Sequence, residues 1–220
     1  MLPFSREAFF AVFAAYNTTV WPAQLFLYGL AAALVVLVVR GRPRTRLAVS
    51  IGLGLLWVWT GVLYHWWHFT AINRPAWGFG ALFVLQGGLF VANGIGGRRL
   101  ELGRPHGWHG WIGGGLVTYT LVVYPLWGLA SGHPVREVPV LGVPCPTTIF
   151  TFGLLFWAVR PIPRHLLVIP VVWAFLGSTA VVLLGVLQDV GLLVTGLLGL
   201  MLLRRAASRV PTESTVADEP

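Results

Sequence analysis

Three histidines and the only cysteine of the chain belong to residue types that bind metal ions. His65 and His68 are three positions apart, which puts them next to each other on one face of a helix. His133 and Cys145 follow in later segments, and Asp189 adds a carboxylate. Together such groups could hold zinc for hydrolysis or pass a soft metal ion inward. The alternatives are an interfacial aromatic role for His68 and a small apolar role for Cys145.

A second group of residues carries polar side-chain atoms within apolar stretches and could line a path for a solute. Polar atoms inside a membrane are costly unless they are hydrated or paired, and a water-filled path would hydrate them. The alternative is that they form hydrogen bonds between helices and hold the bundle together. The group consists of Gln24, Trp57, Gln86, Asn93, Thr147, Thr148, Trp173, Gln188 and Asp189.

Asp189 is the only acidic residue within an apolar stretch, and the chain has no lysine to pair with it. A carboxylate in that position predicts a proton or cation site near the outer end of the last helix. The alternative is a solvated loop carboxylate at the junction of two helices.

Pro22 and Pro146 each stand near the start of an apolar segment. A proline has no backbone N–H, so it frees a carbonyl group that could line a cavity, and it can introduce a bend. Proline is also well tolerated in the first turn of any helix, which is the alternative. Because each proline opens one of two similar segments of the chain, we expect both to act as hinges.

The composition predicts that these residues belong to a membrane protein. Of the 220 residues 56% are hydrophobic and 10% are charged, which is too apolar for an ordinary soluble domain. A membrane-spanning helix needs about 20 apolar residues. Because the fifth and seventh candidates are short, six spans are the alternative to seven. The seven candidate spans lie near 21–39, 47–64, 77–95, 111–129, 145–159, 166–184 and 187–203.

The distribution of arginine predicts the orientation. All fifteen basic residues are arginine, and the net charge is +8. With seven spans and the amino terminus outside, only Arg6, Arg74 and Arg136 lie outside, and the other arginines lie in the cytoplasm. This agrees with the positive-inside rule, predicts a bacterial inner (plasma) membrane location and argues against nucleic acid as a partner. The cytoplasmic positions are 40, 42, 44, 46, 98, 99, 104, 160, 164, 204, 205 and 209.

An internal repeat predicts the architecture. Residues 21–30 resemble residues 145–154, with a proline, a phenylalanine, a glycine and a leucine in register. Residues 84–86 likewise match residues 186–188. We therefore expect an all-α membrane protein in which two parallel three-helix repeats are joined by one linker helix. The expected divisions are an interfacial amphipathic segment (1–17), the first repeat (18–97), a cytoplasmic loop with the linker helix (98–130), the second repeat (131–204) and a disordered tail (205–220).

Two resemblances follow from these features. The layout of three, one and three helices, with a proline opening each unit, is similar to that of the SWEET and PQ-loop carriers. In those carriers the substrate is held between the two units. Tyr64-His65 with Ile72-Asn73, and the run at 144–153 (PCPTTIFTFG), resemble a bacterial multi-pass family of unknown function.

The function expected from these observations is transport of a small solute or ion through a site between the two units. The alternative is a membrane-embedded metal-dependent enzyme, or a soft-metal transporter, that uses the His/Cys/Asp cluster. An accessory factor without a substrate of its own is a further alternative. No cofactor is expected. The expected partners are the lipid bilayer and an unidentified small solute, and a homo-oligomer is left open.

Overall fold

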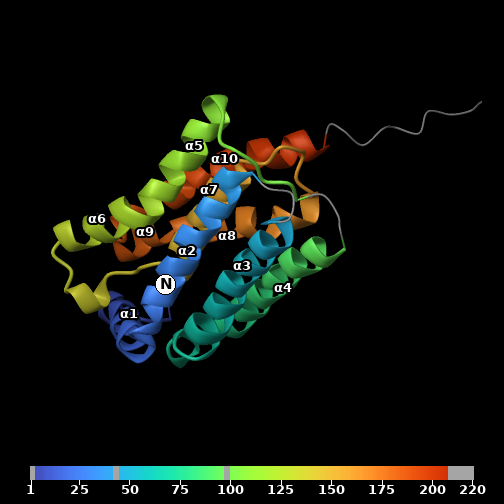
Figure 1. The fold of residues 1–220 in the computed structure, drawn as a ribbon. Coiled ribbons are helices and arrows are strands. Elements are labelled where there is room, and N and C mark those ends of the chain that lie inside the picture. Colours follow the sequence, from blue (N-terminus) through green and yellow to red (C-terminus); the bar gives the residue numbers. More distant parts are fainter. Residues whose placement is uncertain (1–2, 42–44, 97–99, 208–220) are drawn as a thin grey trace, which may run out of the picture.

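The chain folds into a bundle of helices, seen in a computed structural model that describes residues 3–41, 45–96 and 100–207 (Figure 1). The α-helices are α1 (Arg6–Val20), α2 (Ala23–Arg40), α3 (Arg46–Trp59), α4 (Ala76–Ile95), α5 (Gly107–Thr118), α6 (Tyr124–Ala130), α7 (Pro144–Leu155), α8 (Val168–Ser178), α9 (Ala180–Leu184) and α10 (Val190–Ala207). Two π-helical turns, η2 (Thr60–Trp66) and η4 (Tyr119–Val123), and four 3₁₀ turns complete it: η3 (Phe69–Ala71), η5 (Val135–Glu137), η6 (Arg164–Leu166) and η7 (Leu187–Asp189).

Six of the helical segments are long and apolar enough to cross a membrane, and they coincide with six of the seven expected spans. Their outer faces carry exposed apolar side chains, among them Ile95 and Val182, which suit contact with lipid. Exposed tryptophans mark the ends of the spans, as is usual at membrane interfaces. The protein is therefore all-α, and its helices indicate a multi-pass membrane protein. The six segments are Ala23–Arg40, Arg46–Ala71, Ala76–Ile95, Gly107–Ala130, Arg164–Leu184 and Leu187–Ala206.

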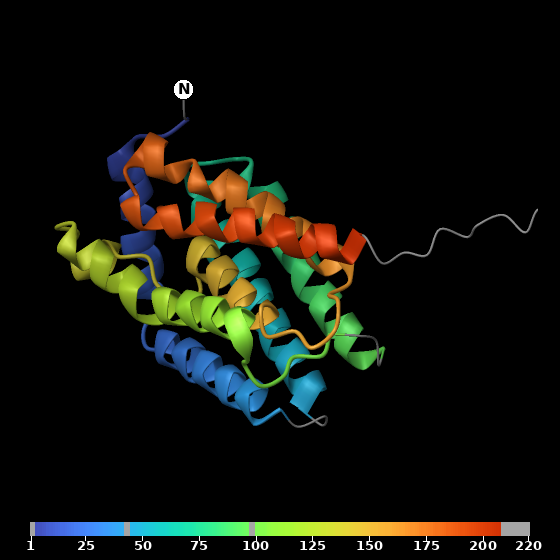
Figure 2. The same cartoon turned by 90° about the horizontal axis from the view of Figure 1, so that it is seen from above.

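The remaining expected span, 145–159, is the short helix α7. Its 12 residues extend about 18 Å, well short of the roughly 30 Å apolar thickness of a bilayer. All of them except Cys145 are buried, and α7 packs against α3, α5, α8 and α10. Figure 2 shows it in the middle of the bundle. The arrangement of seven spans in two repeats, with the amino terminus outside, stays a prediction.

Helix α1 covers one end of the bundle. Ser5 caps its start with a hydroxyl that accepts a hydrogen bond from the Ala8 amide (3.2 Å), and the helix ends beyond the expected segment, at Val20. Asn17 donates hydrogen bonds to the carbonyls of Arg136 (2.7 Å) and Val138 (2.9 Å). The apolar side of α1 is thus turned toward the protein itself. This contact closes one side of the cavity described below.

Glycine pairs allow two of the helix contacts to be very close. A Cβ placed on Gly87 of α4 would lie 2.7 Å from the carbonyl oxygen of Gly54 on α3. A Cβ placed on Gly113 of α5 would lie 2.5 Å from the carbonyl oxygen of Gly153 on α7. In membrane bundles small residues let backbones approach and gain contact area. These pairs fix α3 against α4 and α5 against α7.

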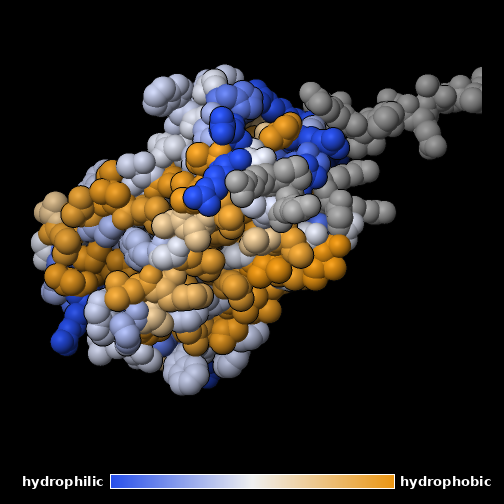
Figure 3. All heavy atoms as spheres, viewed as in Figure 1, coloured by the Kyte–Doolittle hydropathy of each residue, from blue (hydrophilic) through white to orange (hydrophobic). Residues whose placement is uncertain are grey.

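The arginines at the helix ends are unevenly divided. The ends of α2 and α10 and the connections next to them carry most of the described arginines, and hydrophilic residues gather at this end in Figure 3. There Glu101 pairs with Arg46 (2.8 Å) and Arg160 (3.3 Å). Residues 42–44, 97–99 and 208–220 lie outside the described residues, so the arginines there and most of the expected tail do as well.

Candidate functional site

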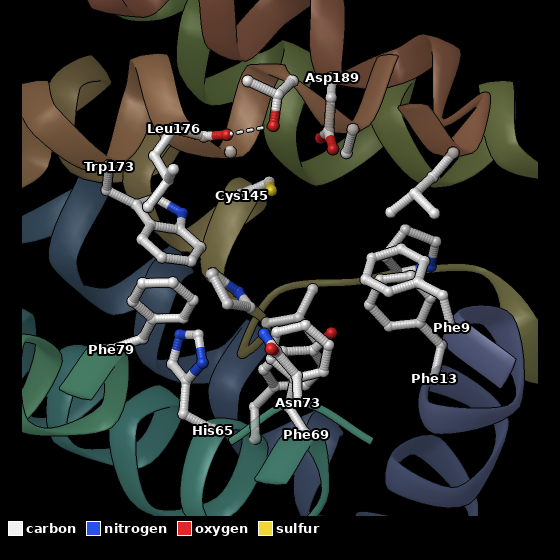
Figure 4. A pocket seen from close by; sticks show the side chains of 18 of the residues that line it. Phe9, Phe13, His65, Phe69, Asn73, Phe79, Cys145, Trp173, Leu176 and Asp189 are labelled. Atoms are coloured by element: carbon white, nitrogen blue, oxygen red, sulfur yellow. Dashed lines mark hydrogen bonds between the residues drawn. The ribbon is translucent and has the colours of Figure 1, made fainter. Parts of the chain in front are cut away.

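A cavity of about 190 Å³ lies at the opposite end of the bundle, between α1, η2, α7, α8 and η7. Figure 4 shows side chains from these elements pointing into it. Its wall is mostly apolar and aromatic, with a few polar groups. Four of these, His65, Cys145, Trp173 and Asp189, are residues predicted from the sequence, and the structure brings them to one place. Small-molecule sites commonly have this composition.

Irregular helix geometry positions two parts of the wall. Helix α3 continues into the π-helical turn η2, which carries Tyr64 and His65. Helix α5 continues into the π-helical turn η4, which ends just before Tyr124. Pro125 follows and has no N–H to donate to the preceding turn, so a wider turn fits there. Such π-turns are frequent at functional sites because they redirect side chains that a regular helix would place elsewhere.

Asp189 forms the acidic side of the cavity. Its side chain lies in η7 and is 2% exposed, so the alternative of a solvated loop carboxylate is wrong. The Tyr124 hydroxyl donates a hydrogen bond to the carboxylate, and the Cys145 thiol is its other side-chain neighbour. Among the described residues no basic side chain forms an ion pair with it. A buried carboxylate is thus held by two neutral donors alone.

His65 forms the opposite side of the cavity. It is fully buried, and neither ring nitrogen has a hydrogen-bond partner among the described residues. Its ring packs against Phe83 (centroids 4.8 Å apart) and Trp173 (5.2 Å). Buried polar groups in native proteins almost always have partners, so an orphan histidine at a cavity requires an explanation.

Trp173 stands between these two sides. Its ring also contacts Phe79 (5.4 Å), and its indole N–H lies beside the Cys145 thiol, a weak acceptor, without a hydrogen bond of good geometry. The cavity therefore has a largely aromatic wall, and the wall includes three residues with polar groups: Asp189, His65 and Trp173. This arrangement could hold a small molecule that has an apolar body and polar groups.

α1 supplies another part of the wall, and its position depends on Tyr16. The Tyr16 hydroxyl donates a hydrogen bond to the Gly142 carbonyl (3.0 Å) and accepts one from the Trp59 indole (2.7 Å). Burial raises the pKa of Tyr16 well above its usual value, so the hydroxyl keeps its proton and its donor role. Phe9 and Phe13, on the same helix, face the cavity (Figure 4).

Replacing His65 with phenylalanine is expected to stabilise the fold. The substitution keeps a ring in the same space and removes two unpaired polar atoms, so the free energy of unfolding should rise by about 1–3 kcal/mol. The matched control is His68→Phe. The His68 Nδ1 donates to the Leu63 carbonyl (2.6 Å), so its loss should destabilise. Unfolding in detergent measures both. A His65→Phe variant less stable than wild type would contradict this account.

The other predicted pathway residues lie outside this cavity, and most are engaged in hydrogen bonds. Gln24 donates to Asn17 (2.7 Å) and lines a separate cavity. Gln86 donates to the Leu166 carbonyl (3.0 Å), although its own carbonyl oxygen is unpaired. Asn93 accepts from the Leu100 amide (3.2 Å). These contacts join helices or loops, as the packing interpretation expects.

The same holds for the residues on and around α7. The Trp57 indole donates to Thr151 (2.9 Å), which joins α3 to α7. The Thr147 hydroxyl pairs with Thr60 (3.2 Å), and Thr148 bonds within its own helix. Gln188 accepts from the Tyr119 hydroxyl (2.6 Å) through its backbone, whereas its side-chain nitrogen is buried and unpaired. Their role in a pathway stays a prediction.

Both predicted hinge prolines stand at helix starts. Pro22 is the residue immediately before α2, in a cis peptide bond with Trp21, and Pro146 is in the first turn of α7. Proline costs little in either place. Hinge motion therefore stays a prediction.

Of the predicted metal ligands, His65 and Cys145 line the cavity, whereas His68 and His133 lie elsewhere. His68 lines another hollow near Pro22, and His133 stacks on Phe10 (4.2 Å). Within residues 3–41, 45–96 and 100–207, no three or more His, Cys, Asp or Glu side chains come together as a metal site. His65 and His68 were expected to be neighbours on one helical face. The prediction fails because the backbone there is a π-turn followed by an irregular turn, which directs the two rings apart.

Sequence analysis missed several wall residues, among them Tyr64, Phe69, Asn73 and Tyr124. Tyr64 and Asn73 belong to the motif on which the family resemblance rests, and that motif was the one sequence signal that pointed to them. Aromatic side chains in an apolar helix otherwise give no indication of whether they face lipid, protein or a cavity.

Comparisons with known proteins identify a family without an assigned activity. No curated protein and no solved structure matches the chain. The model of a family of unknown function matches residues 6–213, which is nearly the whole described chain. This confirms the family of unknown function expected from the sequence: the protein belongs to DUF6064.

Proposed function

We propose that the protein is a carrier for a small solute in the bacterial inner (plasma) membrane, with its amino terminus outside. The solute occupies the cavity between α1, η2, α7, α8 and η7. The two expected three-helix units move against each other around it, so that the cavity opens to one side of the membrane and then to the other.

One observation carries this proposal: His65 and Asp189, two buried polar side chains, lie on different sides of one cavity (Figure 4), and the bundle does not fully satisfy either of them. His65 has no partner, and Asp189 has no counter-charge among the described residues. A buried imidazole needs a hydrogen-bond partner and a buried carboxylate needs a counter-charge, so each costs stability without them. A bound solute would supply them. Trp57 and Thr147, by contrast, already have their partners in the bundle.

The position of the cavity also suits a carrier. Its wall takes η2 and Phe79 from the first expected unit, and Cys145, Trp173 and Asp189 from the second. A change in the contact between the units would alter the site directly. Its size suits a small solute, because an engineered apolar cavity of about 150 Å³ binds benzene.

The single cysteine gives a direct test, because Cys145 lines the cavity. In oriented membrane vesicles, an impermeant thiol reagent should modify Cys145 when added on the outer side, and also, at a lower rate, when added on the inner side. Modification is measured by intact-protein mass spectrometry. Cys145→Ser should give no signal.

A matched control separates access through the cavity from general penetration. Thr151 lies on the same helix, is fully buried and is not part of the cavity wall. In the Cys145→Ser background, Thr151→Cys should stay unmodified from both sides. Modification of Cys145 from one side only would overturn the carrier and leave a binding site. No modification from either side would overturn both.

A further inference from the structure

We infer that the occupant of the cavity is a small organic cation, an ammonium group on a compact apolar body. This inference rests on the proposed function, because it names the class of solute that the site would hold. It is carried by the combination of a carboxylate without a counter-charge and an aromatic wall.

The charge of the wall favours a cation. Among the described residues that line the cavity, Asp189 is the only acidic one and none is an arginine. The remaining titratable groups in the wall, His65, Cys145, Tyr64 and Tyr124, carry no fixed positive charge at neutral pH. An anionic solute would meet a buried carboxylate with nothing to offset it. An ammonium group would supply the missing counter-charge.

The aromatic wall favours the same class of solute. Trp173 and Phe79 stand edge to face, 5.4 Å apart, on the side of Cys145. Phe69 and Tyr64 close the cavity near His65, and Tyr124 approaches from the other side, next to Asp189. Aromatic faces attract cations, tryptophan most strongly, and the attraction is larger where water is excluded. Cages that combine several aromatic rings are a recurrent way of binding alkylammonium groups.

The free ring nitrogens of His65 extend this description. One nitrogen of a neutral imidazole donates and the other accepts. Both nitrogens are buried in this conformation, so the ring would bind a hydroxyl or a carbonyl group of the solute once a neighbouring wall side chain moves aside. In Figure 4 His65 and Asp189 stand on different sides of the cavity. The solute would therefore place its ammonium group toward Asp189 and a second polar group toward His65.

Charge-selective labelling of Cys145 tests this inference without knowledge of the natural solute. The probes are two methanethiosulfonates of similar size, one carrying a trimethylammonium group (MTSET) and the other a sulfonate (MTSES). Each rate is divided by that reagent's rate with a free thiol in solution. We expect this normalised rate to be at least tenfold higher for the cation, because a nearby carboxylate in a desolvated site attracts one and repels the other.

Asp189→Asn should bring the ratio of the two normalised rates close to one. The ratio is the informative quantity, since any change in the reactivity of the thiol itself affects both reagents. The matched control is Glu137→Gln, which removes a carboxylate from a turn that has no buried residue and lies at the same end of the protein. Its ratio should stay at the wild-type value.

The outcomes separate the two proposals. A wild-type ratio near one, with both reagents reaching Cys145, overturns the organic cation and leaves the carrier standing. A ratio that falls equally in Glu137→Gln also overturns it, because the preference would then belong to the surface. Failure of both reagents to reach Cys145 overturns the carrier itself. The wild-type measurement decides the first point even where Asp189→Asn does not fold.

Discussion

A Gly87→Leu variant is expected to lose the native fold. Gly87 faces α3 so closely that even a methyl group there would lie 2.7 Å from the Gly54 carbonyl oxygen and from a methyl group of Val58. Inserting a larger side chain into a packed contact costs about 1–3 kcal/mol, and more where backbone atoms must move. Here the backbone of α3 is the obstacle, so α3 and α4 would have to separate. Size-exclusion chromatography in detergent should show aggregated protein in place of a single species.

The neighbouring residue provides the control. Gly88 is exposed and has open space where a side chain would go. Gly88→Leu makes the same chemical change one position along the same helix, and it should leave the chromatographic profile and the unfolding temperature close to wild type. Equal damage from both variants would mean that the loss of glycine flexibility, and not the contact with α3, is responsible.

Most of the fold follows from the sequence, because long apolar segments between arginine-rich connections have few alternatives. The span at 145–159 shows where this reasoning stops. Its apolar residues indicate burial, but the same apolar pattern is expected whether lipid or protein surrounds the helix. Other helices surround α7 and bury its threonines along with its apolar residues, and it is too short to cross a bilayer alone. A sequence pattern does not show how many other helices surround a segment.

The candidate site was predicted only in pieces. His65 and Cys145 were assigned to a metal site, and Trp173 and Asp189 to a solute pathway, whereas the structure places all four around one cavity. Distances between separate helices are not encoded in local spacing, so the two groups could not be joined from the sequence. The packing alternative applies to Gln86 and other predicted pathway residues, since hydrogen bonds inside a bundle require the same residue types as a hydrated path.

Trp57 and Trp173 allow the packing role and the site role to be compared directly. Each is followed four positions later by a glycine, Gly61 or Gly177, and both were predicted to face the pathway. In the structure Trp57 is fully buried, stacks on Phe83 (4.5 Å) and donates to Thr151 on α7. Trp173 borders the cavity and has no such hydrogen bond.

Trp57→Ala is therefore expected to destabilise the protein by about 3–5 kcal/mol, the usual cost of removing a large buried aromatic side chain. Trp173→Ala should destabilise the protein clearly less, because part of the Trp173 ring already borders the cavity and its removal loses fewer contacts. Denaturant unfolding in detergent, followed by circular dichroism, compares the two variants. Equal losses would mean that the cavity is closed in solution and that both rings are packing residues.

The ratio of the two labelling rates at Cys145 should change more in Trp173→Ala than in Trp57→Ala, which is the reverse of the order expected for stability. Trp173→Ala removes the ring that stands between Asp189 and His65, so the preference for the cationic reagent should weaken although the fold persists. Trp57 does not contribute to the cavity wall, so in whatever fraction of Trp57→Ala remains folded the ratio should equal that of wild type. The two measurements on this pair of tryptophans therefore distinguish a residue that stabilises the bundle from a residue of the proposed solute site.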